Sequence, residues 1–501
     1  MGASASERAA EFEVGALATA ASAAAASPAE LSRKPKAGHA GESSHQLPAL
    51  HGLRFLAAFC ILFSHSCSWL ANFKDNHIIN RFGEFFTVFG MPLFFVLSGF
   101  VIHYNYSRLF STMPPRWAVI EFLGARFARI YPLFICFFLV GLATDQVLQW
   151  YYDDKLNLVL ILAHSLTLTQ SWVYITLFGD RLLVDGPYGL SWSLSTEFFF
   201  YLLYIALVIH IARLRTLRSL LMTAGAMSLI VFAALLYGIS HRAEIEAFAG
   251  QYMDDHFDNW DHSVFRWFFY YSPYVRSFEF VLGCLTAQIY FCLAQSKVSS
   301  GEVRLSRYMI AGSLIFLIAF ALTYLFEPFG PFVGKYVQII KLNYGPAIPI
   351  AVLVFCVSRY RLSAVATLLS TPLMILLGDL SYSIYTVHTW TLRIFARPEM
   401  TFRIGIGLEA VFRIALAIAL TVILSFATYR LIEVPARAWL RAALARRLVR
   451  SFGPRDANML STGLQHSPAI AIVSGISFIL MVGAVLAYQS LIVPYFWPYT
   501  R

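Results

Sequence analysis

The chain has 501 residues, of which 58% are hydrophobic and only 13% are charged. A soluble enzyme of this length does not carry so much apolar surface, so the composition favours a protein with many membrane spans. The net charge of +10 comes from basic residues that lie between apolar segments. This distribution is typical of cytoplasmic loops rather than of a nucleic-acid-binding surface, so we expect no nucleic acid partner.

Residues 1–46 contain polar and alanine-rich stretches such as "ATAASAAAAS" and "SRKPKAGHAGESSHQ". They show no apolar core behind a positively charged start, so they do not resemble a cleaved signal peptide. We predict a disordered cytoplasmic tail here.

The rest of the chain contains twelve apolar segments of about the length that a membrane helix needs. They lie at about 50–70, 84–104, 121–143, 156–174, 190–212, 219–239, 273–293, 307–326, 340–358, 373–392, 408–432 and 467–488. The sequence therefore predicts an all-α, polytopic transmembrane helix bundle.

Basic loops orient these segments, because cytoplasmic loops carry an excess of Arg and Lys. Every basic cluster falls on the cytoplasmic side, and both acidic loops fall outside, if segment 156–174 does not cross. We therefore expect eleven crossings, with the amino terminus in the cytoplasm. Residues 47–440 would form a ten-span core, residues 441–466 a basic cytoplasmic linker, and residues 467–501 an additional carboxy-terminal span.

The first apolar segment carries two ionisable residues on one face. Arg54 and His65 are eleven positions apart, which places them in the same helical phase and about 16 Å apart along the axis. The predicted topology puts Arg54 at the cytoplasmic end and His65 near the outer end.

Two more arginines lie at the predicted cytoplasmic end of the third segment, in "GARFARIYP". Arg126 and Arg129 are three positions apart and so project from one helix face. With Arg54 they suit a phosphate-bearing ligand, because a guanidinium group binds phosphate in bidentate fashion. Plain anchoring by positive charge on the cytoplasmic side is the alternative explanation.

A second set of polar residues is expected near the outer side: His65, Glu197 and His388. Ionisable groups inside a bilayer are expensive unless paired, and so indicate function. His65 has a suitable side chain to accept a proton from a hydroxyl group. Glu197 is predicted to orient it.

The motifs, taken in order, resemble the acyltransferase-3 family of membrane acyltransferases. They are "LHGLRFLAAFCILFSH", "GMPLFFVLSGFVI", "GARFARIYP", "LSWSLSTEFFFYLL", "SPYVRSFEFVLGCLTAQ", "LGDLSYSIYTVHTW" and "YRLIEVPARAW". The resemblance implies transfer of an acyl group, most often acetyl, from cytoplasmic acyl-CoA to a carbohydrate or glycolipid such as lipopolysaccharide or exopolysaccharide. It assigns His65 and Arg54 to the essential pair, and Arg126 and Arg129 to donor binding.

The resemblance also implies a multi-pass protein of the bacterial inner membrane. Acyl-CoA would be a co-substrate, with no permanently bound cofactor and no metal. Ser98, Trp192, Tyr382 and His388 are candidates for lining the acceptor site or the tunnel. Only about a dozen residues follow position 488, so we expect no fused esterase-like domain of the kind some relatives carry.

Two alternatives stay open on the sequence. An acyl-enzyme through Ser98 would replace direct transfer. A transporter of sugars or lipid-linked intermediates would also place polar residues near both leaflets, although the sequence shows no convincing internal duplication.

Overall fold

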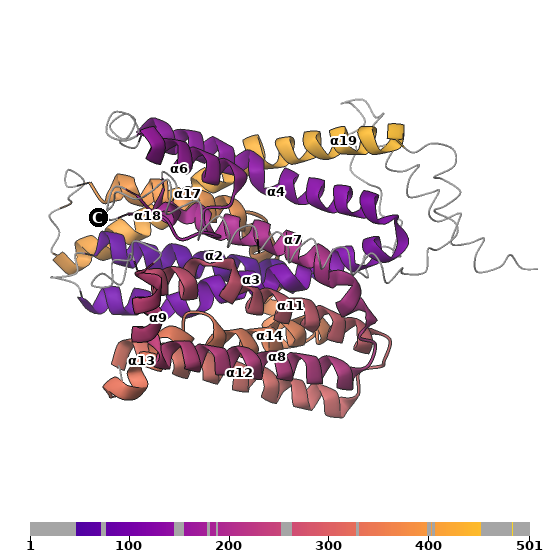
Figure 1. Ribbon diagram of the computed structural model, residues 1–501. Helices are drawn as coiled ribbons and strands as arrows, with labels where there is room; N and C mark the ends of the chain where they lie inside the picture. Colours follow the sequence, from indigo (N-terminus) through magenta and orange to yellow (C-terminus); the bar gives the residue numbers. More distant parts are fainter. Residues whose placement is uncertain are drawn as a thin grey trace, which may run out of the picture.

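The computed structural model describes residues 47–71, 77–144, 155–177, 181–186, 189–251, 263–326, 330–397, 402, 406–451 and 483. Long helices run side by side through this part of the chain (Figure 1). The strands described there are the two-residue pair β1 (Thr176–Leu177) and β2 (Arg181–Leu182), which are antiparallel. The prediction of an all-α membrane bundle is confirmed.

The helices follow one another with short connections. They are α2 (Ala49–Leu70), α3 (His77–Thr112), α4 (Pro115–Thr144), α6 (Lys155–Thr167), α7 (Trp192–Arg213), α8 (Leu217–Ser240), α9 (Arg242–Ala249), α10 (Val264–Arg266), α11 (Pro273–Ala294), α12 (Ser300–Phe326), α13 (Pro331–Ile340), α14 (Tyr344–Arg359), α15 (Ala364–Leu369), α16 (Pro372–Asp379), α17 (Ser381–Phe395), α18 (Ile406–Thr428) and α19 (Val434–Ser451). Short 3₁₀ helices lie at Leu183–Asp185 and Gly189–Ser191, and π-helical turns at Trp267–Tyr271 and Tyr429–Glu433.

Eight helices of the described part are long and apolar enough to cross a membrane, or nine if the bent pair Gly334–Ile340 and Tyr344–Arg359 is one span. The predicted count of eleven includes segment 467–488, which lies outside the described residues apart from Gly483. It also includes segment 373–392, which the structure divides between α16 and α17. Eleven crossings therefore stay a prediction.

Segment 156–174 does not form a long helix. Its helix α6 has 13 residues, which gives a length of about 20 Å against a hydrocarbon core of about 30 Å. The chain then turns inward, and the side chains of Gln170 and Ser171 are fully buried. This geometry agrees with the expectation that the segment does not cross, and it lets α7 begin inside the bundle.

The middle of the bundle depends on a very close approach of α3 and α11. A Cβ atom added to Gly99 would lie 1.9 Å from the carbonyl oxygen of Phe280, and one added to Gly283 would lie 2.1 Å from that of Val96. Such distances leave no space for a side chain, so glycine is required at both positions. Small residues allow the same approach at other helix interfaces in membranes.

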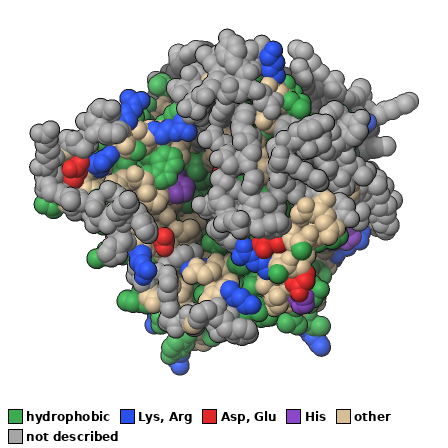
Figure 2. All heavy atoms as spheres, turned by 60° about the vertical axis from the view of Figure 1, so that its left-hand side comes forward, with side chains coloured by type: hydrophobic (Ala, Val, Ile, Leu, Met, Phe, Trp, Pro, Cys, Tyr) green, Lys and Arg blue, Asp and Glu red, His purple; other side chains and the backbone are tan. Residues whose placement is uncertain are grey.

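The connections that carry the basic clusters meet at one end of the bundle. The thiol of Cys292, near the end of α11, donates to the carbonyl oxygen of Arg215 after α7. At the end of α14, Arg359 donates to the carbonyl oxygen of Leu293 and pairs with Glu302 of α12 at 2.6 Å. The end of the molecule at which α2 terminates is turned forward in Figure 2, where basic and hydrophobic side chains lie next to each other.

Two predicted segments fall largely outside the described residues. They are the tail 1–46 and the carboxy-terminal span 467–501. The first part of the predicted linker 441–466 continues helix α19 up to Ser451.

Candidate active site

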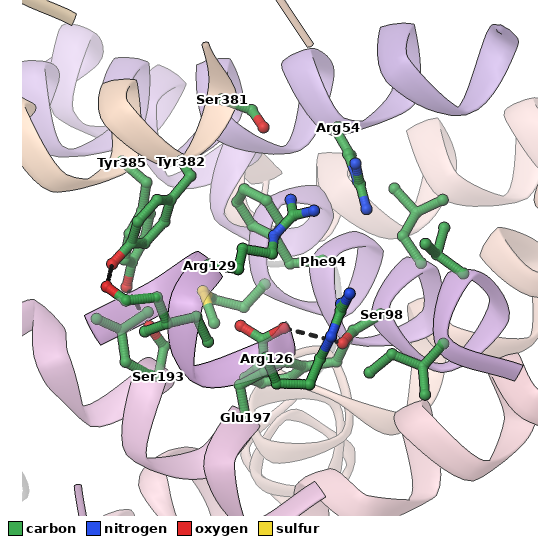
Figure 3. A pocket seen from close by; sticks show the side chains of 17 residues that line it. Arg54, Phe94, Ser98, Arg126, Arg129, Ser193, Glu197, Ser381, Tyr382 and Tyr385 are labelled. Carbon is green, nitrogen blue, oxygen red and sulfur yellow. Dashed lines mark hydrogen bonds between the residues drawn. The ribbon is translucent and has the colours of Figure 1, made fainter. Parts of the chain in front are cut away.

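The three predicted donor-site arginines share one cavity in the bundle. Arg54 comes from α2, and Arg126 and Arg129 come from successive turns of α4. Figure 3 shows their side chains directed toward the same space, together with Glu197 of α7 and Ser98 of α3. We call this the arginine cavity. Its volume is about 80 Å³.

The arginines differ in how the protein holds them. Arg126 is buried, and its Nη2 donates a 2.6 Å hydrogen bond to the hydroxyl of Tyr106, over whose ring the guanidinium group also lies. Within the described residues, Arg54 and Arg129 make neither a hydrogen bond nor an ion pair. Two guanidinium groups are thus available in this cavity for an anionic ligand.

The net charge of the arginine cavity is positive. Three guanidinium groups line it, against the single carboxyl group of Glu197. In an apolar surrounding such an excess attracts an anion more strongly than it would in water. Phosphate groups fit this arrangement because guanidinium groups bind them with parallel hydrogen bonds.

Glu197 does not lie where the sequence predicted it. It accepts a 3.1 Å hydrogen bond from Ser98 and lines the arginine cavity, whereas His65 lines a different one. The expected hydrogen bond from Glu197 to His65 is therefore wrong. The reason is the buried segment before α7: because the chain folds into the bundle before the helix starts, Glu197 lies deeper than a helix beginning at the membrane surface would place it.

His65 faces a second, larger cavity of about 390 Å³, which we call the histidine cavity. Most of its wall is aromatic or hydroxyl-bearing. The residues of these kinds are Ser64, Trp69, Thr87, Trp192, Tyr270, Tyr271, Tyr385, Thr389 and Trp390. Its volume lies in the usual range for a small-molecule site.

A chain of hydrogen bonds fixes the proton positions on two histidines. Nδ1 of His388 lies 2.7 Å from the carbonyl oxygen of Tyr385, and Nε2 of His388 lies 3.0 Å from Nδ1 of His65. A carbonyl oxygen only accepts, so Nδ1 of a neutral His388 carries the proton and its Nε2 accepts. Nδ1 of His65 is then the donor, which leaves the lone pair of His65 on Nε2.

This hydrogen-bond chain gives His65 the arrangement of a general base. The side chain of His388 is fully buried, and its ring stacks on that of His65 with centroids 5.2 Å apart. His388 thus takes the orienting position that the sequence assigned to Glu197. A catalytic histidine is commonly held by a partner at its other nitrogen in this way.

The remaining predicted residues divide between the two cavities. Ser98 and Tyr382 line the arginine cavity, and the hydroxyl of Tyr382 donates to the carbonyl oxygen of Ile130 at 2.6 Å. Trp192 lines the histidine cavity. His388 lines neither, but contacts His65 from behind.

Two residues that the sequence did not single out lie on both cavities. Met91 and Tyr385 belong to the wall of each one. Tyr385 lies three positions before His388, on the same face of α17, so helical spacing was a usable signal for it. A methionine in an apolar helix offers no such signal.

Comparisons with known proteins agree with this geometry. Residues 47–430 match the acyltransferase-3 family model, described as an acyltransferase domain. The chain is 25% identical over 356 residues to "Acyltransferase MdmB" of Streptomyces mycarofaciens, covering 70% of this chain and 79% of the relative. It is 29% identical over 161 residues to "Protein 2 in picA locus" of Rhizobium radiobacter, covering 30% of this chain and 75% of the relative.

No solved structure shows significant similarity to the chain. The family model covers more than half of the 501 residues, including all three arginines and both histidines of the site. The chain therefore belongs to the acyltransferase-3 family and is a membrane acyltransferase.

Proposed function

We propose that this protein is a multi-pass enzyme of a bacterial inner membrane that moves an acyl group from cytoplasmic acyl-CoA to a hydroxyl of an extracytoplasmic carbohydrate or glycolipid. The observation that carries the proposal is the pair of adjoining cavities. One presents three arginines, and the other presents His65 with a lone pair on Nε2.

Phosphates of acyl-CoA bind at Arg54, Arg126 and Arg129 in this proposal. The basic connections at the same end of the chain favour a cytoplasmic location for them. The extended pantetheine arm then reaches from the arginines toward His65, which is eleven residues further along α2, or about 16 Å along the axis. Acyl-CoA is a co-substrate here, and acetyl is the expected acyl group.

The acceptor hydroxyl enters the histidine cavity from the outer side. Its oxygen attacks the carbonyl carbon of the thioester, the C–S bond breaks, and the thiolate of CoA leaves. Nε2 of His65 takes the proton of the hydroxyl and passes it to the leaving sulfur. The aromatic side chains Trp69, Trp192 and Trp390 in the wall suit a carbohydrate, because flat rings pack against the C–H faces of sugars.

Direct transfer explains these positions better than an acyl-enzyme through Ser98. The hydroxyl of Ser98 is hydrogen-bonded to Glu197 and lies in the arginine cavity, whereas His65 lines the other cavity. A serine nucleophile needs its base within hydrogen-bond reach.

The test uses purified full-length protein in lipid vesicles, with labelled acetyl-CoA on one side and a glycan extract of the source membrane on the other. We expect label to appear on the glycan and CoA to be released in equal amount. The variant His65→Ala should lower this rate at least about 100-fold, since a general base contributes about 10²–10⁴-fold. Equal rates in both proteins, at matched amounts in the vesicles, would exclude the mechanism.

The same vesicles separate an enzyme from a transporter. A transporter moves sugar or a lipid-linked intermediate across the vesicle membrane without consuming acyl-CoA. Such movement, with no acylated product, would replace the proposed function.

A further inference from the structure

The two cavities meet at a partition made of two side chains. Of the described residues, Met91 and Tyr385 line both cavities. Both are buried, with exposed fractions of 7% and 5%. Under the proposed function, on which this inference rests, the acyl group has to pass these two side chains to come within reach of His65.

Tyr385 is the fixed side of the partition. Its hydroxyl donates to the carbonyl oxygen of Leu190 at 3.0 Å and lies 2.6 Å from Oγ of Ser193. Its ring packs edge-on against Phe94, with centroids 5.8 Å apart. Its own carbonyl oxygen faces Nδ1 of His388 at 2.7 Å. A side chain tied at both ends in this way does not move aside without breaking the histidine arrangement.

Met91 is the adaptable side of the partition. Its side chain is unbranched and has three rotatable bonds, so it changes shape more readily than a branched or aromatic one. The backbone beneath it is held against α2: a Cβ atom added to Gly90 would lie 2.5 Å from Cγ1 of Ile61. The width of the passage therefore depends on the Met91 side chain rather than on helix movement.

We propose that Met91 is the specificity-determining residue for the acyl group and restricts the enzyme to short chains such as acetyl. The geometry supports this in two ways. The arginine cavity, at about 80 Å³, offers little room for a long chain beside the pantetheine end. The acyl group also leads the sulfur through the partition, so a longer chain meets Met91 before its thioester reaches His65.

The test compares acetyl-, butyryl- and hexanoyl-CoA as donors for the purified full-length protein in vesicles. Wild type should prefer acetyl-CoA. Met91→Ala should raise the kcat/KM ratio of hexanoyl- to acetyl-CoA by about tenfold or more, because each methylene that a pocket excludes or admits changes discrimination by about 10-fold or more. Met91→Leu, which conserves volume, is the matched control and should keep the wild-type ratio.

Several outcomes overturn the inference. They are a wild type that prefers hexanoyl-CoA, or an unchanged ratio in a Met91→Ala protein that still uses acetyl-CoA. If Met91→Ala does not fold, Met91→Phe tests the opposite direction and should lower the butyryl-to-acetyl ratio; an unchanged ratio there overturns the inference too. A wild type that uses none of the three donors would instead remove the proposed function itself.

Discussion

Nδ1 of His65 and Nε2 of His388 lie 3.0 Å apart, although 323 positions separate the two residues in the chain. The carbonyl oxygen of Tyr385 fixes the far side of His388. The two rings therefore work as one unit in which the outer histidine sets the proton position of the inner one. Met91 and the aromatic wall then decide what reaches the free nitrogen.

His388 is expected to act as a positioning residue. His388→Leu removes the acceptor for Nδ1 of His65, so the lone pair on Nε2 is no longer enforced. We expect kcat to fall about 10–100-fold, within what loss of a general base allows, with little change in the KM for acyl-CoA. Kinetics in vesicles measure both.

His388→Gln provides the matched comparison, because its amide oxygen can accept from Nδ1 of His65. It should keep clearly more activity than His388→Leu. Equal losses in kcat, or a loss that appears only in KM, would contradict the positioning role.

Arg54 and Arg129 are expected to bind the donor phosphates. The double variant Arg54→Ala/Arg129→Ala removes both guanidinium groups that have no protein partner within the described part of the chain. Hydrogen bonds to charged groups contribute about 1.5–3 kcal/mol each, so the Kd for acyl-CoA should rise at least tenfold. Calorimetry or filter binding on the purified protein gives this value.

The control for donor binding is Arg116→Ala on the same helix. Arg116 is exposed and lies outside the arginine cavity, so the Kd should stay within about twofold. The same increase in Kd for Arg116→Ala would point to general charge attraction, which weakens with salt.

The buried pair Arg276–Glu279 is expected to stabilise the bundle. Both side chains are fully buried, and Nη1 of Arg276 donates to Glu279 at 3.0 Å and to the carbonyl oxygen of Leu342 at 2.7 Å. Removing one partner of such a pair destabilises a protein by about 3–5 kcal/mol, because a buried charge is left uncompensated. Glu279→Ala should therefore lower the Tm strongly.

An exposed pair serves as the control for this loss. Glu246 pairs with Arg242, whose side chain is 38% exposed, so Glu246→Ala should change stability by less than about 1 kcal/mol. If both variants melted at the same temperature, the buried pair would have no special role. Thermal unfolding of the purified proteins in one detergent makes the comparison.

Gly99 and Gly283 are expected to tolerate no side chain. An added methyl group at either position would lie within 2.1 Å of a backbone oxygen of the facing helix, so α3 and α11 would have to separate. Gly283→Ala should sharply reduce the amount of folded protein in the membrane, measured by fluorescence-detected size exclusion.

Gly225→Ala and Gly312→Ala are matched controls in α8 and α12. An added Cβ meets nothing within 4 Å at either position, so both variants should keep the wild-type amount. Normal levels of Gly283→Ala protein would show that the helices move apart easily.

Much of the architecture follows from composition and spacing. The apolar segments predicted helices because a backbone inside a bilayer must satisfy its own hydrogen bonds. The polar interruptions His164, Thr167, Thr169 and Gln170 set segment 156–174 apart from the others, and the structure has a short helix and a buried turn there. The three arginines were found from their charge and helical phase, because few residues of that kind occur inside an apolar helix.

The partners inside the site were not predictable in the same way. Glu197 was expected beside His65 because depth was counted from the ends of apolar segments. Helix α7 starts inside the bundle, and the carboxyl group faces Ser98 instead. A helix pattern gives the phase of a residue, but not the depth at which its helix begins.

The sequence by itself determined an all-helical membrane protein, the face that carries Arg54 and His65, and the arginines of the donor site, because hydropathy and helical phase are local properties. Only the tertiary structure decided that His388 orients His65, that Glu197 faces the arginines, and that Met91 and Tyr385 divide the two cavities. These contacts join α2, α3, α7 and α17. They depend on how far each helix slides along its neighbours, which close packing at residues such as Gly99 and Gly283 fixes.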